Sequence, residues 1–441
     1  MLFGVNDAGA ATIDGAADGG TVANDSRAET TGTADSMAEE QVDLAVQQYL
    51  QKIQELEFNG GVYQPDLAET LAGLGAIYLE QGNHSGAEET FQRALHNSRV
   101  NDGLYNQNQL PILEQLISLN TFTRDWPDLD QNYSYLYWLS KRNYGPNDPR
   151  LLPVIDRIGR WHLHAYAYAG DGQQLQHLQV ADNLYGKFIQ IVETHYGAND
   201  PRLVNALYGV ALTSYQMAVL ASDAEKFNEI RNGQGSAFNS GRRELLQEAR
   251  SRDDLMLSGF VRGKNAMERV VAIHEANSQL SPEARAVALV HLADWYLLFN
   301  KWNSSQETYS QAYKVLTDRG LPTDEIDGLF AQPRSLPAFL FPENEREEQA
   351  SAEEEQLDEN QQQAGDEVPT GEVPYVLLSF DVSRSGTPRN IQVIESSPPD
   401  SISLQRKAKQ NIGKSKFRPR LSKGVAVDAT GIRRRYLFPE Q

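Results

Sequence analysis

Residues 375–382 (YVLLSFDV) show the pattern that decides how the C-terminal part of the chain folds. Every second residue is apolar and large, at Val376, Leu378, Phe380 and Val382. That alternation is the period of a strand that buries one face. Ser385-Gly386 offers a turn, and Ile391 and Val393 resume the alternation. The pattern predicts a β-hairpin.

A helix and further strands are predicted after this hairpin. Leu404, Ala408 and Ile412 recur four residues apart, which is the spacing of one helix face. Phe417-Arg418-Pro419 ends the helix, and Gly424 turns the chain. Returning strands are indicated by apolar residues at Val425, Val427, Tyr436 and Phe438.

The predicted order β-β-α-β, with Phe-x-Pro after the helix and an aromatic last strand, resembles the C-terminal domain of the TonB family. The matching residues are Val376, Phe380, Val382, Gly386, Val393, Glu395, Ser396, Ser397, Ala408, Phe417, Pro419, Gly424 and Phe438. The resemblance implies a periplasmic α+β domain that pairs with a peptide of an outer-membrane transporter. It also implies that the peptide adds to the last strand, at Arg433, Arg434, Arg435, Tyr436, Leu437 and Phe438.

The chain departs from the resembling family at two points. Family members are anchored in the inner membrane by an N-terminal helix and often have a Pro-rich spacer, whereas this chain has no run of about 18 apolar residues and its spacer is acidic. Residues 1–5 are too short for a signal-peptide core and have no basic residue before them. We therefore expect a lost signal or anchor upstream of Met1.

Composition restricts the classes of function. The 441 residues include no cysteine, which excludes disulfides, thiolate metal sites and cysteine nucleophiles. The net charge of −20 argues against nonspecific nucleic-acid binding. A hydrophobic content of 40% suffices for packed cores, and the length suggests two or three domains.

Helical repeats are predicted through residues 39–320. Six positions match the spacing of a tetratricopeptide repeat, in which small residues let two antiparallel helices approach and large ones fill the seam. These positions are Leu74, Gly75, Tyr78, Ala87, Phe91 and Ala94. The same offsets recur at Leu292, Ala293, Tyr296, Ser305, Tyr309 and Ala312, with Ser305 departing slightly. The pattern predicts an α-solenoid with helix pairs at residues 65–98 and 283–316.

A nearly repeated octapeptide predicts helix–loop–helix junctions. Residues 144–151 (YGPNDPRL) return as residues 196–203 (YGANDPRL), 52 positions later. Glycine ends a helix, aspartate caps the next one, and proline occupies its first position. Insertions are expected near residues 170–172 and 232–243, where glycine is frequent.

The sequence thus predicts four segments: a disordered segment at 1–38, the repeats at 39–320, a Pro-punctuated and then acidic linker at 321–368, and the TonB-like domain at 369–441. Residues 343–367 contain 11 acidic residues and one arginine, whereas the region from Pro369 onward contains 13 basic and 6 acidic residues. The acidic stretch is expected to cover the basic domain transiently at low salt.

No catalytic, cofactor or metal site is predicted. His162 and His164 are two residues apart and face different sides of a helix, so we expect core or surface histidines. Asp125, Asp128 and Asp130 lack the glycine and glutamate of a calcium loop. Neither a Gly-x-Ser-x-Gly elbow nor a phosphate loop is present.

The favoured hypothesis is a non-enzymatic, periplasmic interaction adaptor, in which the repeats dock one protein and the TonB-like domain pairs with a peptide of another. One alternative is a TonB-type energy transducer whose anchor lies upstream of Met1. Another is an enzyme whose site lies on the solenoid groove, with convergent polar residues of shifted pKa. The sequence names neither the partner, nor the groove ligand, nor the oligomeric state.

Overall fold

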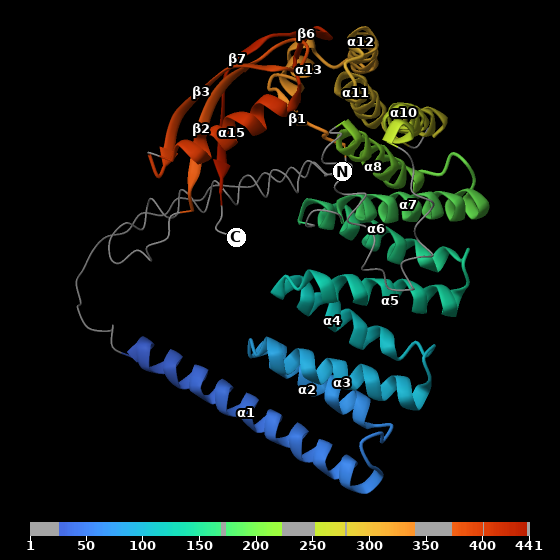
Figure 1. The fold of residues 1–441 in the computed structure, drawn as a ribbon, viewed down its shortest axis with the longest axis vertical. Coiled ribbons are helices and arrows are strands. Elements are labelled where there is room, and N and C mark those ends of the chain that lie inside the picture. Colours follow the sequence, from blue (N-terminus) through green and yellow to red (C-terminus); the bar gives the residue numbers. More distant parts are fainter. Residues whose placement is uncertain are drawn as a thin grey trace, which may run out of the picture. The chain divides into compact units, whose positions relative to one another are not determined.

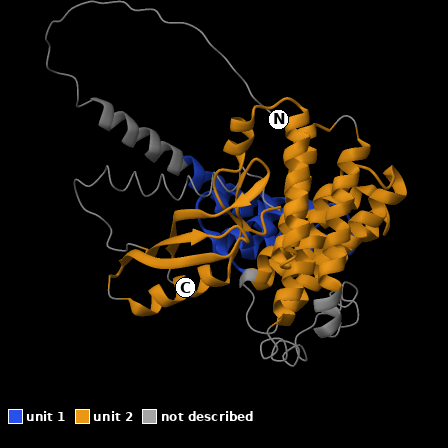
Figure 2. Cartoon of the chain, turned by 90° about the horizontal axis from the view of Figure 1, so that it is seen from above, with its two compact units in different colours: residues 1–125 blue, residues 126–441 orange. Residues whose placement is uncertain are grey.

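The chain is mainly helical, of the solenoid class, with a small α+β domain at its C-terminal end, as the sequence predicts (Figure 1). The computed structural model describes residues 26–168, 173–222, 252–277, 280–339, 373–399 and 401–438. The chain divides into two compact units, residues 1–125 and residues 126–441 (Figure 2). The expected insertions and the acidic stretch 343–367 lie outside the described residues.

Unit 1 contains the first predicted helix pair. Its helices are α1 (Ser26–Gly60), α2 (Leu67–Glu80), α3 (His84–Asp102) and α4 (Gln109–Thr123). Only three residues separate α2 from α3, so these two helices are antiparallel. Gly75 permits their close approach, because a Cβ atom there would lie 2.7 Å from the ring of Phe91, which is fully buried. A small residue of one helix packed against a large residue of the other is the arrangement that the repeat spacing predicts.

Unit 2 begins with a run of helices that precedes the C-terminal domain. They are α5 (Trp126–Tyr144), the 3₁₀ turn η1 (Pro149–Leu151), α6 (Leu152–Tyr168), α7 (Gln174–Tyr196), α8 (Leu203–Ser222), α10 (Arg252–Ala276), α11 (Pro282–Leu298), α12 (Trp302–Asp318) and α13 (Thr323–Leu329). The second predicted pair is α11 with α12, joined by three residues. Ala293, Tyr309 and Ala312 lie buried in it.

Both copies of the repeated octapeptide form the predicted junctions. Gly145 (φ 96°) and Gly197 (φ 100°) adopt positive φ at the ends of α5 and α7, a conformation that suits glycine. The Asp148 carboxylate accepts the Arg150 backbone N–H at 2.8 Å, and Asp200 accepts from Arg202 in the same way. The Arg150 side chain and backbone N–H bonds lower the pKa of Asp148 to about 2.

Among the described residues, α8 alone is long and apolar enough to cross a membrane by length and composition. About two thirds of it is buried, and the core helix of a soluble protein passes the same test. α8 packs on α7 and α10, and Gly209 lies against the ring of Tyr185 from α7. We therefore interpret α8 as a core helix.

Two segment boundaries predicted from the sequence are wrong. Residues 26–38 belong to helix α1 and not to a disordered segment, although their three alanines and one glutamate, which favour helix, stand among several residues of low helix propensity. Residues 321–339 are not linker either. Ile326 of α13, together with Leu336 and Phe339, is buried, so prolines punctuate a packed segment here.

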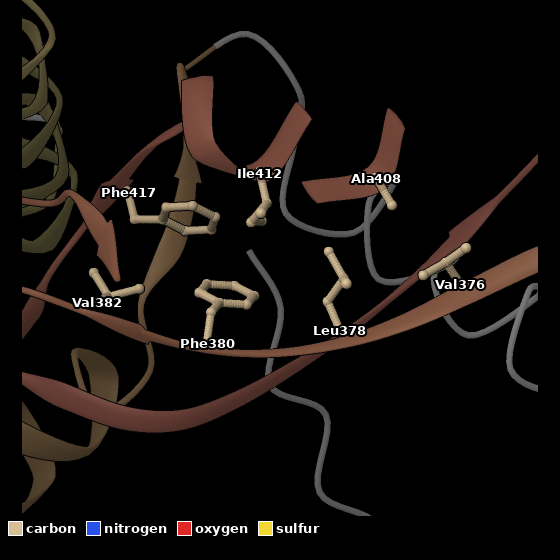
Figure 3. Close-up of a cluster of buried hydrophobic side chains, with 7 residues drawn as sticks. All are labelled: Val376, Leu378, Phe380, Val382, Ala408, Ile412 and Phe417. Atoms are coloured by element: carbon tan, nitrogen blue, oxygen red, sulfur yellow. The ribbon is translucent and has the colours of Figure 1, made fainter. Parts of the chain in front are cut away.

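The C-terminal domain is a three-stranded antiparallel sheet covered by one helix. Its elements are β2 (Tyr375–Val382), β3 (Pro388–Ser397), α15 (Ile402–Lys414), β4 (Lys416–Arg418), β5 (Arg420–Ser422), β6 (Val425–Val427) and β7 (Ala429–Leu437). The sheet order is β3-β2-β7. The alternate residues of β2 predicted to face inward pack against Ala408, Ile412 and Phe417 (Figure 3). The predicted hairpin, helix and returning strands are confirmed.

Substitution of Gly75 by alanine tests the close packing of α2 on α3. The added Cβ meets a buried ring, so unfolding free energy should fall by about 1–3 kcal/mol. In the control Gly186→Ala, within α7, the Cβ meets nothing within 4 Å, and a gain of about 0.5–1 kcal/mol is expected from helix propensity. Denaturant unfolding measures both, and equal changes at the two positions would contradict the packing.

Candidate protein-interaction surface

The predicted peptide-pairing strand is an edge strand. β7 pairs antiparallel with β2 in unbroken register from Tyr375 opposite Leu437 to Phe380 opposite Ile432. Among the described residues, β7 pairs with no other strand. An edge strand exposes one row of backbone donors and acceptors, which a further strand can use.

The hydrogen-bond alternation identifies which backbone groups of β7 point outward. Phe438 donates its N–H to the carbonyl of Pro374 at 2.7 Å, which makes these two residues a hydrogen-bonded pair. Such pairs alternate along an antiparallel ladder, so Tyr436 and Arg434 also bond to β2. The N–H groups of Arg433, Arg435 and Leu437 therefore point away from the sheet.

The other edge of the sheet is less regular. β3 pairs with β2 through two register shifts, and Asn390 within it adopts a positive φ of 53°. Bulges of this kind interrupt the row of outward groups and blunt an edge. β7 is therefore the better of the two edges for adding a strand.

Side chains along β7 divide between the two faces of the sheet. Ile432, Tyr436 and Phe438 pack on the core beneath α15, and burial raises the pKa of Tyr436. On the opposite face, the Arg435 guanidinium lies 4.6 Å from the ring centre of Tyr375. Arg433, Arg434 and Arg435 are all exposed. The edge is thus cationic on both faces.

A buried ion pair fixes this domain to α11. The Arg418 guanidinium donates to both carboxylate oxygens of Asp294, with Nε at 3.0 and 3.1 Å and Nη2 at 2.6 Å. The Arg418 side chain is 7% exposed and that of Asp294 is inaccessible. The Tyr309 hydroxyl of α12 donates to the same carboxylate at 2.6 Å. Burial, and then the Asp294 charge, raise the pKa of Tyr309 well above its usual value.

Polar contacts of the β5–β6 hairpin extend this attachment. The Gln306 amide of α12 donates to the carbonyl of Gly424 at 2.9 Å and accepts the N–H of Ala426 at 3.0 Å. Asp327 of α13 accepts the N–H of Lys423 at 2.8 Å, a bond that lowers the Asp327 pKa. Gly424 has a φ of 75°, and a Cβ there would lie 2.9 Å from Tyr313.

A short strand before the acidic stretch completes the attachment. β1 (Arg334–Leu336) pairs antiparallel with β4, with Arg334 opposite Arg418. Phe339 follows it and stacks on Tyr208 of α8, with ring centres 5.8 Å apart. The segment expected to be linker therefore joins the helices to the C-terminal domain.

The structure separates the predicted site residues into three places. The positions of the first repeat match lie on α2 and α3, those of the second on α11 and α12, and Arg433 to Leu437 lie in β7. Of the repeat positions, Tyr78 and Tyr296 are half-buried and the others buried. Sequence reasoning missed Asp294. An aspartate between Ala293 and Trp295 in an apolar run was the available signal.

Comparison with protein families finds one match, in which residues 369–438 fit the family model described as Gram-negative bacterial TonB protein C-terminal. No curated protein matches the chain significantly. A solved structure described as that of BtubC (BKLC) from P. vanneervenii aligns over 64% of this chain and 92% of that chain, with 12% identity and a TM-score of 0.34. That likeness is too weak to support an inference.

The family match confirms the resemblance of the C-terminal domain, and it does not extend to the helices. It indicates a protein-interaction role of the kind found in the Gram-negative envelope. Whether the helix pairs are tetratricopeptide repeats is not decided by it. The open edge of β7 is the part of this domain whose geometry suits such an interaction.

Loss of the buried ion pair should detach the domain from α11. Arg418→Ala leaves the Asp294 carboxylate without its cation, so unfolding free energy should fall by about 3–5 kcal/mol. The double variant Arg418→Met/Asp294→Leu removes both charges and should recover most of that loss. Arg420→Ala, two residues away and exposed, should change it by no more than about 0.5 kcal/mol. Equal effects of Arg418→Ala and Arg420→Ala would show that the pair does not matter.

Proposed function

We propose that the chain is a non-enzymatic adaptor of the periplasm, in which β7 binds an extended peptide of an outer-membrane or periplasmic protein by strand addition. The open, regular edge of β7 is the observation that supports this proposal. Its outward donors at Arg433, Arg435 and Leu437 supply main-chain affinity, and side chains supply specificity.

The charge of the edge favours an acidic partner peptide. A strand added alongside β7 places its side chains next to Arg433 and Arg435 on one face and Arg434 on the other. Exposed ion pairs contribute little to affinity each, but complementary charge raises association rates and discriminates against basic segments.

The helices supply a second docking surface in this proposal. Antiparallel helix pairs of unit 2, such as α11–α12, present side chains from neighbouring helices to one partner. Because the C-terminal domain is attached to α11, α12 and α13, a protein bound to these helices and a peptide on β7 would be held by one body. This is the arrangement that an adaptor requires.

Proline scanning of β7 tests strand addition. Arg435→Pro removes an outward donor while sparing the bonds to β2, since proline is tolerated in an edge strand with its nitrogen facing solvent. Arg435→Ala removes the charge and the guanidinium contact with the Tyr375 ring but keeps the backbone donor. In pull-downs from envelope fractions with the full chain, partners should be lost from Arg435→Pro and retained, somewhat weakened, by Arg435→Ala.

Two controls make this comparison decisive. Arg434→Pro removes a donor to β2, so it should lower the melting temperature, whereas Arg435→Pro should leave it close to that of the parent chain. Equal partner loss from Arg435→Ala and Arg435→Pro would indicate recognition of charge and not strand addition. Retention of every partner by both variants would remove β7 from the interface.

A further inference from the structure

Three side chains of metal-binding type meet inside unit 2, each from a different helix. They are Asp130 of α5, His162 of α6 and His177 of α7, and their ligand atoms all lie within 4.8 Å of one another. The two Nδ1 atoms are 2.9 Å apart, and the Asp130 Oδ1 lies 3.9 Å from the Nδ1 of His162. Two imidazoles and one carboxylate form a common donor set for transition metals.

The separations suit simultaneous bonds to one ion. Metal–nitrogen bonds of about 2.0–2.1 Å place two nitrogens about 2.9 Å apart at a right angle and about 3.4 Å apart at a tetrahedral angle. The histidine nitrogens stand at the first of these distances, and about 0.5 Å more between them gives the tetrahedral angle that Zn²⁺ prefers. The Asp130 carboxylate oxygen, 3.9 Å from the His162 nitrogen, must approach it by about 1 Å to match.

The surroundings hold the donors in place. His162 is 2% and His177 7% exposed, so bulk water has little access to the nitrogens of either ring. The Trp161 indole N–H donates to the Asp130 Oδ1 at 3.3 Å, the kind of outer contact that orients a ligating carboxylate. Burial lowers the pKa of His162 well below its usual value and that of His177 to about 4. Neutral rings near pH 7 are the form that binds metal.

We propose that Asp130, His162 and His177 bind a divalent transition-metal ion, with Zn²⁺ as the first candidate, and thereby join α5, α6 and α7. Without cysteine, the donor set is nitrogen and oxygen only, which Zn²⁺ accepts. Three protein ligands leave a further position for water. The competing interpretation is a neutral, hydrogen-bonded histidine pair in the core.

Metal titration of the chelator-treated full chain tests this proposal. Zn²⁺ binding is followed by calorimetry and Co²⁺ binding by visible absorption, in the parent chain and in His177→Ala. The control is His164→Ala, which removes an exposed histidine two residues from His162 on the same helix. The parent and His164→Ala should bind one equivalent and melt at a higher temperature with metal. His177→Ala should bind at least about 100-fold more weakly, since even outer-shell changes cost 10–100-fold.

Each outcome decides the question. A parent chain that binds neither Zn²⁺ nor Co²⁺ overturns the proposal, and so does His177→Ala binding as tightly as the parent. If His177→Ala does not fold, His177→Gln keeps the size and a hydrogen bond but not the imidazole. The Co²⁺ spectrum of the parent chain requires no variant, and absorption showing only oxygen ligands would also overturn the proposal.

Discussion

The Arg418–Asp294 ion pair is the constraint on which the C-terminal half of the structure depends. Burying two charges costs several kcal/mol per ion, and this cost is offset only where the geometry satisfies both groups. Here the guanidinium donates to both oxygens and Tyr309 adds a third donor, so the carboxylate is fully used. β4 explains why the pair can form, because adjacent residues of a strand point to opposite sides. Phe417 enters the core of the C-terminal domain while Arg418 reaches α11.

This attachment changes how the C-terminal domain can act. The chain before and after the acidic stretch belongs to unit 2. Before the stretch, Phe339 packs on Tyr208 of α8, and after it β2 begins the sheet of the C-terminal domain. The domain is therefore fixed to the helices by β1, the β5–β6 hairpin and the ion pair, and not only by a tether. A fixed edge strand loses little orientational freedom when a peptide binds, which lowers the cost of association.

Local periodicity allowed much of this fold to be predicted. The alternation of apolar residues predicted β2, and apolar residues four positions apart predicted α15. Small residues at the repeat spacing from large ones predicted the α2–α3 and α11–α12 pairs. The repeated Tyr-Gly-x-Asn-Asp-Pro-Arg-Leu gave both junctions, because its glycine, capping aspartate and proline each act locally. These features depend on neighbours within a few residues, which the sequence displays directly.

Contacts between distant residues could not be predicted in the same way. Asp294 and Arg418 are 124 positions apart, and no periodicity relates a single buried carboxylate to its partner. His164 is the histidine nearest to His162 in the sequence, whereas the histidine that contacts it in the structure is His177 on the next helix. The segment 321–339 was misassigned for a related reason. Its prolines are visible in the sequence, but the burial of Phe339 against Tyr208 depends on where α8 lies.

The basic character of the β7 edge has a local source, the strand alternation, and a distant one, a lysine of α15. Alternation places Arg433 and Arg435 on the face away from α15, and Lys407 of α15 lies over Phe438 on the other face, 5.6 Å from its ring centre. Cations thus border both faces of the edge, so an added strand would meet positive charge whichever way its side chains point. Like charges would also oppose the pairing of one β7 with another copy, since edge strands that carry charge resist self-association. The same arginines therefore favour an acidic peptide and disfavour a second copy of this strand.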